Sequence, residues 1–253
     1  MQNHNEKEYV ELFHLLFLSQ FGPKMDKSQY ALKGGCNLHF YLNSIRCSED
    51  MDIDLQHIAQ PTLRNKVRKC LQSDPLKRIL ATRNIEIANF SETKQTETTQ
   101  RWKIGLNVKG ISQELRTKIE FSRRGPIEGC KFQPVSPDII GKYSLSPILA
   151  NHYPADIAFS QKIDALANRK ETQARDVFDL DLILGKGIDI QTASHLKATI
   201  TQAEAKAIDI PFDQFKSQVL AYLPQDLQTQ YESPDIWDAI ILRVTEALGK
   251  IDR

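Results

Sequence analysis

The chain has 253 residues, of which 41% are hydrophobic and 26% charged, which excludes a disordered polyelectrolyte. Lys and Arg number 33 against 32 Asp and Glu, so a polyanionic partner would need a local basic patch. No apolar run approaches the roughly 20 residues that span a bilayer, and the first residues are polar, without a signal-peptide core. We therefore expect a cytoplasmic protein that has no membrane segment.

The cysteines and histidines show no pattern that marks a metal site. The four cysteines lack Cys-x-x-Cys spacing, and the histidines lack metal-ligand spacing. The sequence alone therefore predicts reduced thiols rather than a zinc site or a disulfide framework.

The amino-terminal half alternates helix and strand patterns. Apolar residues at three-and-four spacing predict an amphipathic helix over residues 6–20 that ends before a Gly-Pro pair. Residues 30–32 predict a strand, and the following Gly34-Gly35 predicts a turn that opens a short helix.

Residues 50–55 read Asp-Met-Asp-Ile-Asp-Leu, the strict alternation of a half-buried strand. The apolar members should face the core, so Asp50, Asp52 and Asp54 share the other face. Further patterns predict a helix over 62–72, strands over 85–90, 102–108 and 115–121, and a hairpin loop over 91–100.

Beyond about Pro134 the pattern becomes helical, after a linker-like zone that several prolines punctuate. The expected fold class is α+β, with a mixed sheet and flanking helices followed by an all-helical carboxy-terminal part. We place the boundary at residues 135/136, within an interval of 135 to 150. The predicted helices cover 155–169, 174–185, 192–207, 212–222 and 234–249.

The most informative motif combines the glycine pair with the acidic strand. Carboxylates at i and i+2, such as Asp50 and Asp52, project side by side, which costs free energy unless a cation neutralises them. Oxygen ligands favour Mg²⁺ or Mn²⁺. Paired glycines before a helix allow backbone amides to approach a phosphate. Each half alone is more often a plain turn or a solvated strand face, but their combination favours metal-assisted phosphoryl chemistry on a triphosphate.

The string from Leu32-Lys33-Gly34-Gly35 to Ser48-Glu49-Asp50-Met51-Asp52 resembles the first motif of the AbiEii/AbiGii toxin family, nucleotidyltransferases of the DNA polymerase β-like superfamily. The resemblance implies that the glycine pair cradles a nucleoside triphosphate and that Asp50 and Asp52 hold the metal. Asp54 has the same parity and is a lesser candidate. Arg46 and Ser48, within the motif, are candidate nucleotide-binding residues.

A third carboxylate completes the metal site in that superfamily. Lys118-Ile119-Glu120-Phe121 resembles the family's lysine-x-acid strand, which makes Glu120 this residue. The motif is short, and Lys-x-Glu on a strand is more often a surface charge pair.

A late stretch, from Lys162 through Arg169 to Arg175-Asp176, resembles another family signature. The resemblance makes Lys162 and Arg175 candidates to contact the nucleotide phosphates. Asp176 would either orient basic groups or assist the attacking hydroxyl. The alternative is a helix pair decorated by salt bridges.

Residues 64–83 carry a local basic excess, within which Arg64, Arg68 and Lys69 are candidate RNA contacts. A solvated helix face is the commoner explanation of such an excess.

We therefore expect a nucleotidyltransferase core over residues 1–135 and a helical domain over 136–253 that completes the active-site cleft. The enzyme would transfer a nucleotide from a triphosphate to an acceptor hydroxyl and release pyrophosphate, with Asp50, Asp52, Glu120, Lys162 and Asp176 as catalytic residues. The resemblance implies a bacterial toxin with a cognate antitoxin, and some relatives modify the 3′ end of tRNA. The alternatives are a small-molecule or protein acceptor, and a non-catalytic nucleotide-binding interaction protein.

Overall fold

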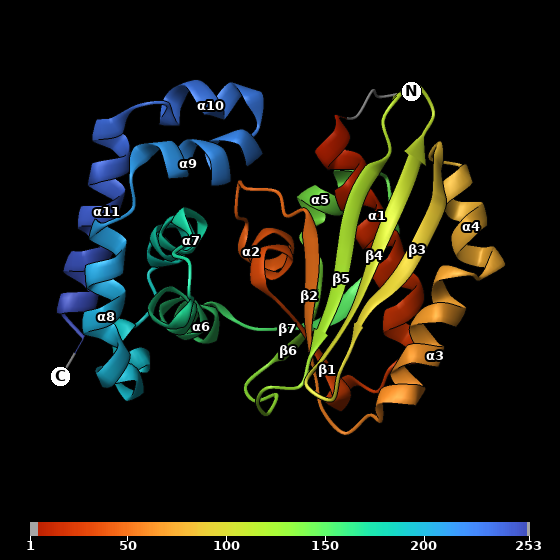
Figure 1. Cartoon of the computed structure of the whole chain (residues 1–253), viewed down its shortest axis with the longest axis horizontal. Helices are drawn as coiled ribbons and strands as arrows, with labels where there is room; N and C mark the ends of the chain where they lie inside the picture. Colours follow the sequence, from red (N-terminus) through yellow and green to blue (C-terminus); the bar gives the residue numbers. More distant parts are fainter. Residues whose placement is uncertain (1–4, 252–253) are drawn as a thin grey trace. The chain divides into compact units, whose positions relative to one another are not determined.

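The computed structural model describes residues 5–251, which form two compact units (Figure 1). The first unit comprises the residues up to Asn43 together with Cys47–Tyr153. The second comprises Ser44–Arg46 together with the residues from Pro154 onward. The chain thus contributes three residues to the second unit before it returns to the first.

The first unit is built on a seven-stranded mixed sheet in the order β3-β4-β5-β2-β1-β7-β6. Strand β2 pairs antiparallel with β1 and parallel with β5, and β1 pairs parallel with β7. The sheet and its flanking helices confirm the predicted fold class. The strands are β1 (Tyr30–Lys33), β2 (Asp50–Leu55), β3 (Ile85–Gln95), β4 (Thr99–Val108), β5 (Leu115–Ser122), β6 (Lys131–Pro134) and β7 (Leu149–His152).

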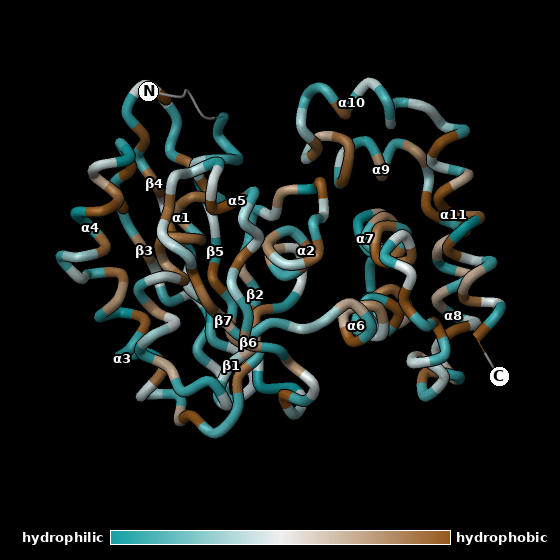
Figure 2. The backbone as a smooth tube through the Cα atoms, turned by 180° about the vertical axis from the view of Figure 1, so that it is seen from behind, coloured by the Kyte–Doolittle hydropathy of each residue, from teal (hydrophilic) through white to brown (hydrophobic). Residues whose placement is uncertain are grey.

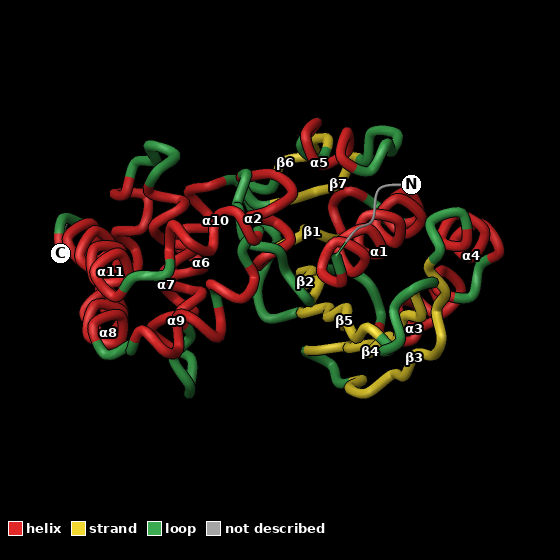
Figure 3. Tube along the Cα trace, turned by 90° about the horizontal axis from the view of Figure 1, so that it is seen from above, coloured by secondary structure: helices red, strands yellow, loops and turns green. Residues whose placement is uncertain are grey.

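The helices of this unit are α1 (Glu6–Phe21), α2 (Gly34–Leu42), α3 (Gln60–Leu71), α4 (Asp74–Ala81) and α5 (Pro137–Lys142). Figure 3 shows α1 and α4 on one side of strands β4 and β5. Apolar and polar segments alternate along α3 and α4 in Figure 2, as in helices with one buried face. Their buried residues share one core with Met51, Ile53 and Leu55 of β2. The alternation of β2 therefore turns its three aspartates away from this core, as predicted.

The second unit contains only helices among its described residues. An aromatic core holds it together: Phe215 stacks on Trp237 at 4.5 Å between ring centroids, and Trp237 Nε1 donates a hydrogen bond to the Ile210 carbonyl at 2.9 Å. The helices are α6 (Ala155–Asn168), α7 (Ala174–Leu184), α8 (Lys197–Ile208), α9 (Phe212–Gln218), α10 (Gln225–Tyr231) and α11 (Pro234–Gly249). No described helix of either unit is both long and apolar enough to span a bilayer.

Several sequence predictions differ from the structure, and helix α4 was not predicted. The predicted loop 91–100 is mostly strand, because β3 and β4 continue to the pair Gln95 and Gln100. Helix α5 and strand β7 lie in the zone where a linker was predicted, since elements this short carry little periodicity. Strand β6 lies just before that zone, where no element was predicted. The predicted helix 192–207 begins as a 3₁₀ helix over Ile190–Leu196, and 212–222 is α9 followed by a 3₁₀ turn. Helix α10 was not predicted; none of its residues is fully buried.

Candidate functional site

The glycine pair forms the first turn of α2, directly after β1. Gly34 has φ of 64°, in the left-handed region where glycine is favoured. No side chain caps this helix, and its first turn holds no acidic residue. The amino-terminal amides of α2 and the positive end of its dipole are therefore suited to an anion.

Gly34 also lies against Asp52. A Cβ atom built on Gly34 would come within 3.0 Å of Asp52 Oδ2. Only a residue without a side chain lets the turn and this carboxylate approach so closely. The structure thus brings the two halves of the first motif together.

Glu120 lies next to Asp52 on the neighbouring strand. The parallel register of β2 and β5 pairs Asp50 with Lys118 and Asp52 with Glu120. Asp52 and Glu120 are both half-buried, and their side chains point to the face of the sheet opposite the core residues of their strands. Three carboxylates, of Asp50, Asp52 and Glu120, therefore share one face of the sheet.

Basic side chains accompany these carboxylates. Lys118 Nζ lies 2.7 Å from Asp50 Oδ2, and Arg101 of β4 lies 2.5 Å from Glu120 Oε2. Lys33 Nζ lies 2.5 Å from Asp54 Oδ1. These pairs could not be predicted from the sequence, because they depend on strand register and on the fold.

Asp54 differs from the other two aspartates of β2. Its second oxygen accepts a hydrogen bond from the Tyr153 hydroxyl at 3.1 Å, in addition to the Lys33 ion pair. Asp54 is thus satisfied by two side chains of the fold, which favours a structural role for it.

Asp52 has an unusual electrostatic environment. Burial raises the pKa of Asp52, and the neighbouring carboxylates of Glu120 and Asp50 raise it further, against the lowering effect of Lys33 and Lys118. A buried carboxyl group whose pKa is raised by two neighbouring acids is a candidate ligand for a cation, because a cation would stabilise its ionised form.

The donor chemistry fits a hard divalent cation, because all the candidate ligand atoms are carboxylate oxygens. The oxygens of Asp50, Asp52 and Glu120 do not, however, form a three-ligand cluster within 4.8 Å in residues 5–251. In this structure Lys118 and Arg101 neutralise the negative charges of Asp50 and Glu120, as a bound cation would. Asp50 and Glu120 would have to turn away from these bases for all three acids to share an ion.

Ser48 and Cys36 both form hydrogen bonds to the start of β2. The Ser48 hydroxyl donates to the Asp50 carbonyl at 2.9 Å, and the Cys36 thiol donates to the same carbonyl at 3.2 Å. These bonds hold the backbone that carries the Asp50 side chain.

A groove of about 630 Å³ adjoins Asp50 on the same face of the sheet. Basic side chains of β4 and β5 line it together with three acidic residues. Its lining includes Asp50, Asn89, Ser91, Lys103, Arg116, Lys118, Glu49 and Glu114.

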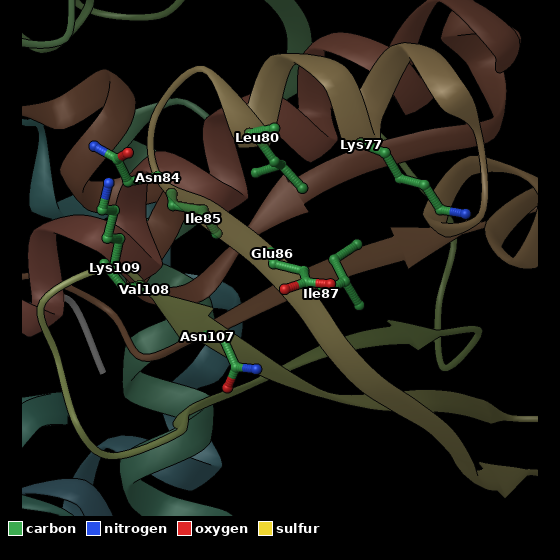
Figure 4. A pocket seen from close by; sticks show the side chains of 10 residues that line it. Lys77, Leu80, Asn84, Ile85, Glu86, Ile87, Asn107, Val108 and Lys109 are labelled. Atoms are coloured by element: carbon green, nitrogen blue, oxygen red, sulfur yellow. The ribbon is translucent and has the colours of Figure 1, made fainter.

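A second groove, of about 710 Å³, does not include any of the candidate site residues. Figure 4 shows that it lies between α4 and the ends of β3 and β4. Lys77 and Lys109 contribute its positive charges, and Leu80 and Ile85 part of its apolar wall.

In the second unit, Lys162 lies in a buried ion-pair network. Its Nζ is 2.9 Å from Asp176 Oδ1 and 2.6 Å from Asp179 Oδ2. Arg169 approaches the other Asp176 oxygen at 2.7 Å, and Arg46 approaches Asp179 Oδ2 at 3.0 Å. Arg46 is thus a partner of Asp179 in this unit, a pairing the sequence did not predict.

The network controls the ionisation of Asp179. Burial alone would raise the pKa of Asp179, but the charges of Arg46 and Lys162 hold it below its ordinary value. Arg175, the remaining candidate of this region, is half-buried on α7.

The basic residues of α3 lie across the sheet from the carboxylates, because α3 packs on the core face. Arg64 and Arg68 both form ion pairs with Glu92 of β3, and Lys69 is exposed. Two arginines that share one carboxylate still leave a net positive charge on this surface.

Comparisons with known proteins agree with this architecture. JHP933 from Helicobacter pylori has a TM-score of 0.60 at 19% identity, over 99% of this chain and 96% of that chain. MenT4, a nucleotidyltransferase toxin from Mycobacterium tuberculosis H37Rv, has a TM-score of 0.65 at 16% identity, over 97% of this chain and 84% of that chain. These identities support a shared fold alone. No curated protein matches the chain.

The family described as nucleotidyl transferase AbiEii toxin, type IV TA system, matches residues 13–242. The match spans the sheet of the first unit and most helices of the second. This chain therefore belongs to the AbiEii family of nucleotidyltransferase toxins of type IV toxin–antitoxin systems.

Proposed function

We propose that this protein transfers a nucleotide from a nucleoside triphosphate to a hydroxyl at the 3′ end of tRNA, with a divalent cation and Asp50, Asp52 and Glu120 as the central residues. The observation that carries this proposal is the β2–β5 register. It pairs Glu120 with Asp52, whose carboxylate lies against the Gly34 turn.

The amino terminus of α2 would bind the triphosphate. Its uncapped amides at Gly34 and Gly35 offer donors, and the helix dipole favours negative charge there. Lys33, the residue before the pair, adds a positive charge close to this end of the helix. These groups would position the triphosphate beside Asp52.

A divalent cation bound to the three carboxylates would neutralise charge on the triphosphate and on the attacking oxygen. Lys118 and Arg101 would then be released from Asp50 and Glu120. Both bases lie next to the carboxylates and could stabilise the charge that develops on transferred phosphate oxygens.

Lys162 and Arg175 are the residues of α6 and α7 that we propose as phosphate contacts, with Arg46 and Asp176 as positioning residues. Asp176 contacts Lys162 and Arg169 through both of its oxygens. These contacts favour an orienting role for Asp176 over that of a base for the acceptor hydroxyl.

The groove beside Asp50 is the place we propose for the acceptor. Lys103, Arg116 and Lys118 line it and could pair with RNA phosphates. A groove that reaches Asp50 would deliver a 3′ hydroxyl to the same face of the sheet as the carboxylates.

The test is to incubate the purified chain with each of the four labelled triphosphates, Mg²⁺ or Mn²⁺, and either total RNA or purified tRNA. Label in tRNA that requires the cation, and that Asp52→Asn abolishes, is the expected result. Label in protein or in a small molecule would assign a different acceptor. Absence of transfer to every acceptor, with cation-independent nucleotide binding, would support a non-catalytic protein instead.

A cognate antitoxin is the partner that we propose from family membership. Growth arrest on expression, relieved by co-expression of a neighbouring gene, would identify it.

A further inference from the structure

Glu11, His39 and Cys47 form a cluster of three different ligand types within the first unit. His39 Nε2 lies 2.9 Å from Glu11 Oε2, and Cys47 Sγ lies 3.4 Å from the same oxygen. One ligand atom from each residue lies within 4.8 Å of the others. In residues 5–251, no other trio of histidine, cysteine or acidic side chains meets this criterion.

The carboxylate of Glu11 is buried at this place. Glu11 is only 3% exposed. Lys142 Nζ is 3.7 Å from Glu11 Oε1 and lies closer to Glu8, at 3.1 Å. The Tyr143 hydroxyl also hydrogen-bonds the Glu11 carboxylate, so a metal ion at this place would replace Tyr143 and Lys142 as its partners.

The donor set selects the kind of ion. A thiolate, an imidazole nitrogen and a carboxylate oxygen are the ligands that Zn²⁺ takes in tetrahedral sites, whereas Mg²⁺ prefers oxygen alone. Three protein ligands would leave the fourth coordination position for water or an anion. Lys142 is 37% exposed and could turn to solvent or remain with Glu8.

We propose that Glu11, His39 and Cys47 form a zinc site that is separate from the oxygen-only carboxylates of the candidate active site. Zinc binds the thiolate, so binding releases the Cys47 proton to solvent.

The site would join three segments that position the candidate active site. Glu11 lies on α1, His39 on the last turn of α2, and Cys47 three residues before Asp50. The other end of α2 begins with the glycine pair. Bound zinc would therefore fix α2 and the segment before β2 to α1, and so stabilise the first unit.

Cobalt titration of the full chain is the primary test. Co²⁺ in a tetrahedral thiolate site gives d–d bands and a near-ultraviolet sulfur-to-cobalt charge-transfer band. We expect one such ion per chain, displaced by Zn²⁺. Cys47→Ser should remove the charge-transfer band, and His39→Gln should weaken cobalt binding. Cys130→Ser, outside the cluster, is the matched control and should retain the full signal.

The Asp52→Asn variant separates this site from the active site. It should retain the charge-transfer band even if nucleotide transfer is lost, because Asp52 is not one of the three ligands. Failure of nucleotide transfer would therefore leave the zinc proposal intact, and failure to bind cobalt would leave the proposed transferase activity intact.

A second measurement needs no variant. Zn²⁺ should slow alkylation of Cys47 in the wild-type chain, as mapped by mass spectrometry, and raise the thermal unfolding midpoint. Equal alkylation of Cys47 with and without Zn²⁺, or a charge-transfer band that persists in Cys47→Ser, would overturn the proposal.

Discussion

Asp52 combines two properties at the residue scale: it lies against a glycine turn, and it must ionise beside two other acids. Replacement of Asp52 should therefore change activity and stability in different directions. A raised pKa in the folded state means that the ionised carboxylate destabilises the fold at neutral pH.

We predict that Asp52→Asn lowers nucleotide transfer by at least about 100-fold, since several kcal/mol of charge stabilisation would be lost. The same change should leave the urea unfolding midpoint at neutral pH equal or higher, because it removes repulsion with Glu120 and Asp50. Transfer assays and urea titrations check the two parts. Undiminished transfer in a folded Asp52→Asn protein would contradict the assignment.

Gly34 offers a second prediction at this scale. Gly34→Ala places a side chain in the left-handed region and against Asp52 Oδ2, at 3.0 Å. We expect a loss of about 1–2 kcal/mol in the free energy of unfolding, together with reduced transfer. Gly141→Ala is the control, because its Cβ would meet nothing within 4 Å. Equal free energies of unfolding for the two variants would show that the close approach of Gly34 to Asp52 does not affect stability.

At the scale of elements, α6 and α7 are held by buried charges rather than by apolar contacts alone. Asp179 is fully buried and contacts both Lys162 and Arg46. Removal of one member of such a network leaves uncompensated charge in a low-dielectric interior.

Asp179→Ala should therefore lower the free energy of unfolding by about 3–5 kcal/mol. Asp181→Ala, two residues along the same helix, is the comparison. It breaks an ion pair with the more exposed Arg243, which should cost less than about 1 kcal/mol. Chemical denaturation of both variants provides the measurement, and equal losses would argue against a buried network.

Helix α3 carries the second prediction at this scale. Charge reversal at Arg64, Arg68 and Lys69 should weaken RNA use and flatten its dependence on salt, since fewer counterions would be released. These residues lie on exposed positions of a helix that packs on the core face of the sheet. An unchanged salt slope would remove α3 from the path of the RNA. Charge reversal at Lys103 and Arg116, in the groove proposed for the acceptor, is the positive comparison and should weaken RNA use in the same way.

For the whole molecule, acid stability should depend on two buried histidines of the first unit. Burial lowers the pKa of His14 to about 4, against the raising effect of Asp50 and Glu11. Burial likewise lowers the pKa of His152 to about 4. Unfolded histidine titrates near 6.5, so the unfolded chain binds more protons between these values.

Stability should therefore be complete above about pH 6.5 and fall as the pH drops toward about 4, by up to about 3 kcal/mol for each histidine. Urea unfolding at about pH 7 and about pH 5 measures this loss. His14→Gln should reduce the pH dependence, and exposed His195→Gln should not. A pH-independent midpoint over this range would contradict the buried, neutral state of both histidines.

Much of the local structure could be predicted from periodicity. The ranges of α1, β2, α3, α6, α7 and α11 agree with the predictions within a few residues, because each element carries its full repeat in its own sequence. Short or exposed elements such as β6 and α10 could not be predicted, because four to seven residues contain too few repeats of the hydrophobic pattern. The proposed division of roles between residues 1–135 and 136–253 stays a prediction.

Two features of the candidate site could be predicted from neighbouring residues alone: Asp50 and Asp52 share one strand face, and a glycine pair opens a helix before them. These are properties of neighbours along the chain, set by the two-residue period of a strand and by the backbone freedom of glycine.

The remaining contacts of these sites arise only when distant segments of the chain pack together. The pairing of Glu120 with Asp52, the partnership of Arg46 with Asp179, and the meeting of Glu11, His39 and Cys47 each join residues far apart in the chain. Such contacts depend on strand register and on helix packing in one shared core, which no local repeat encodes.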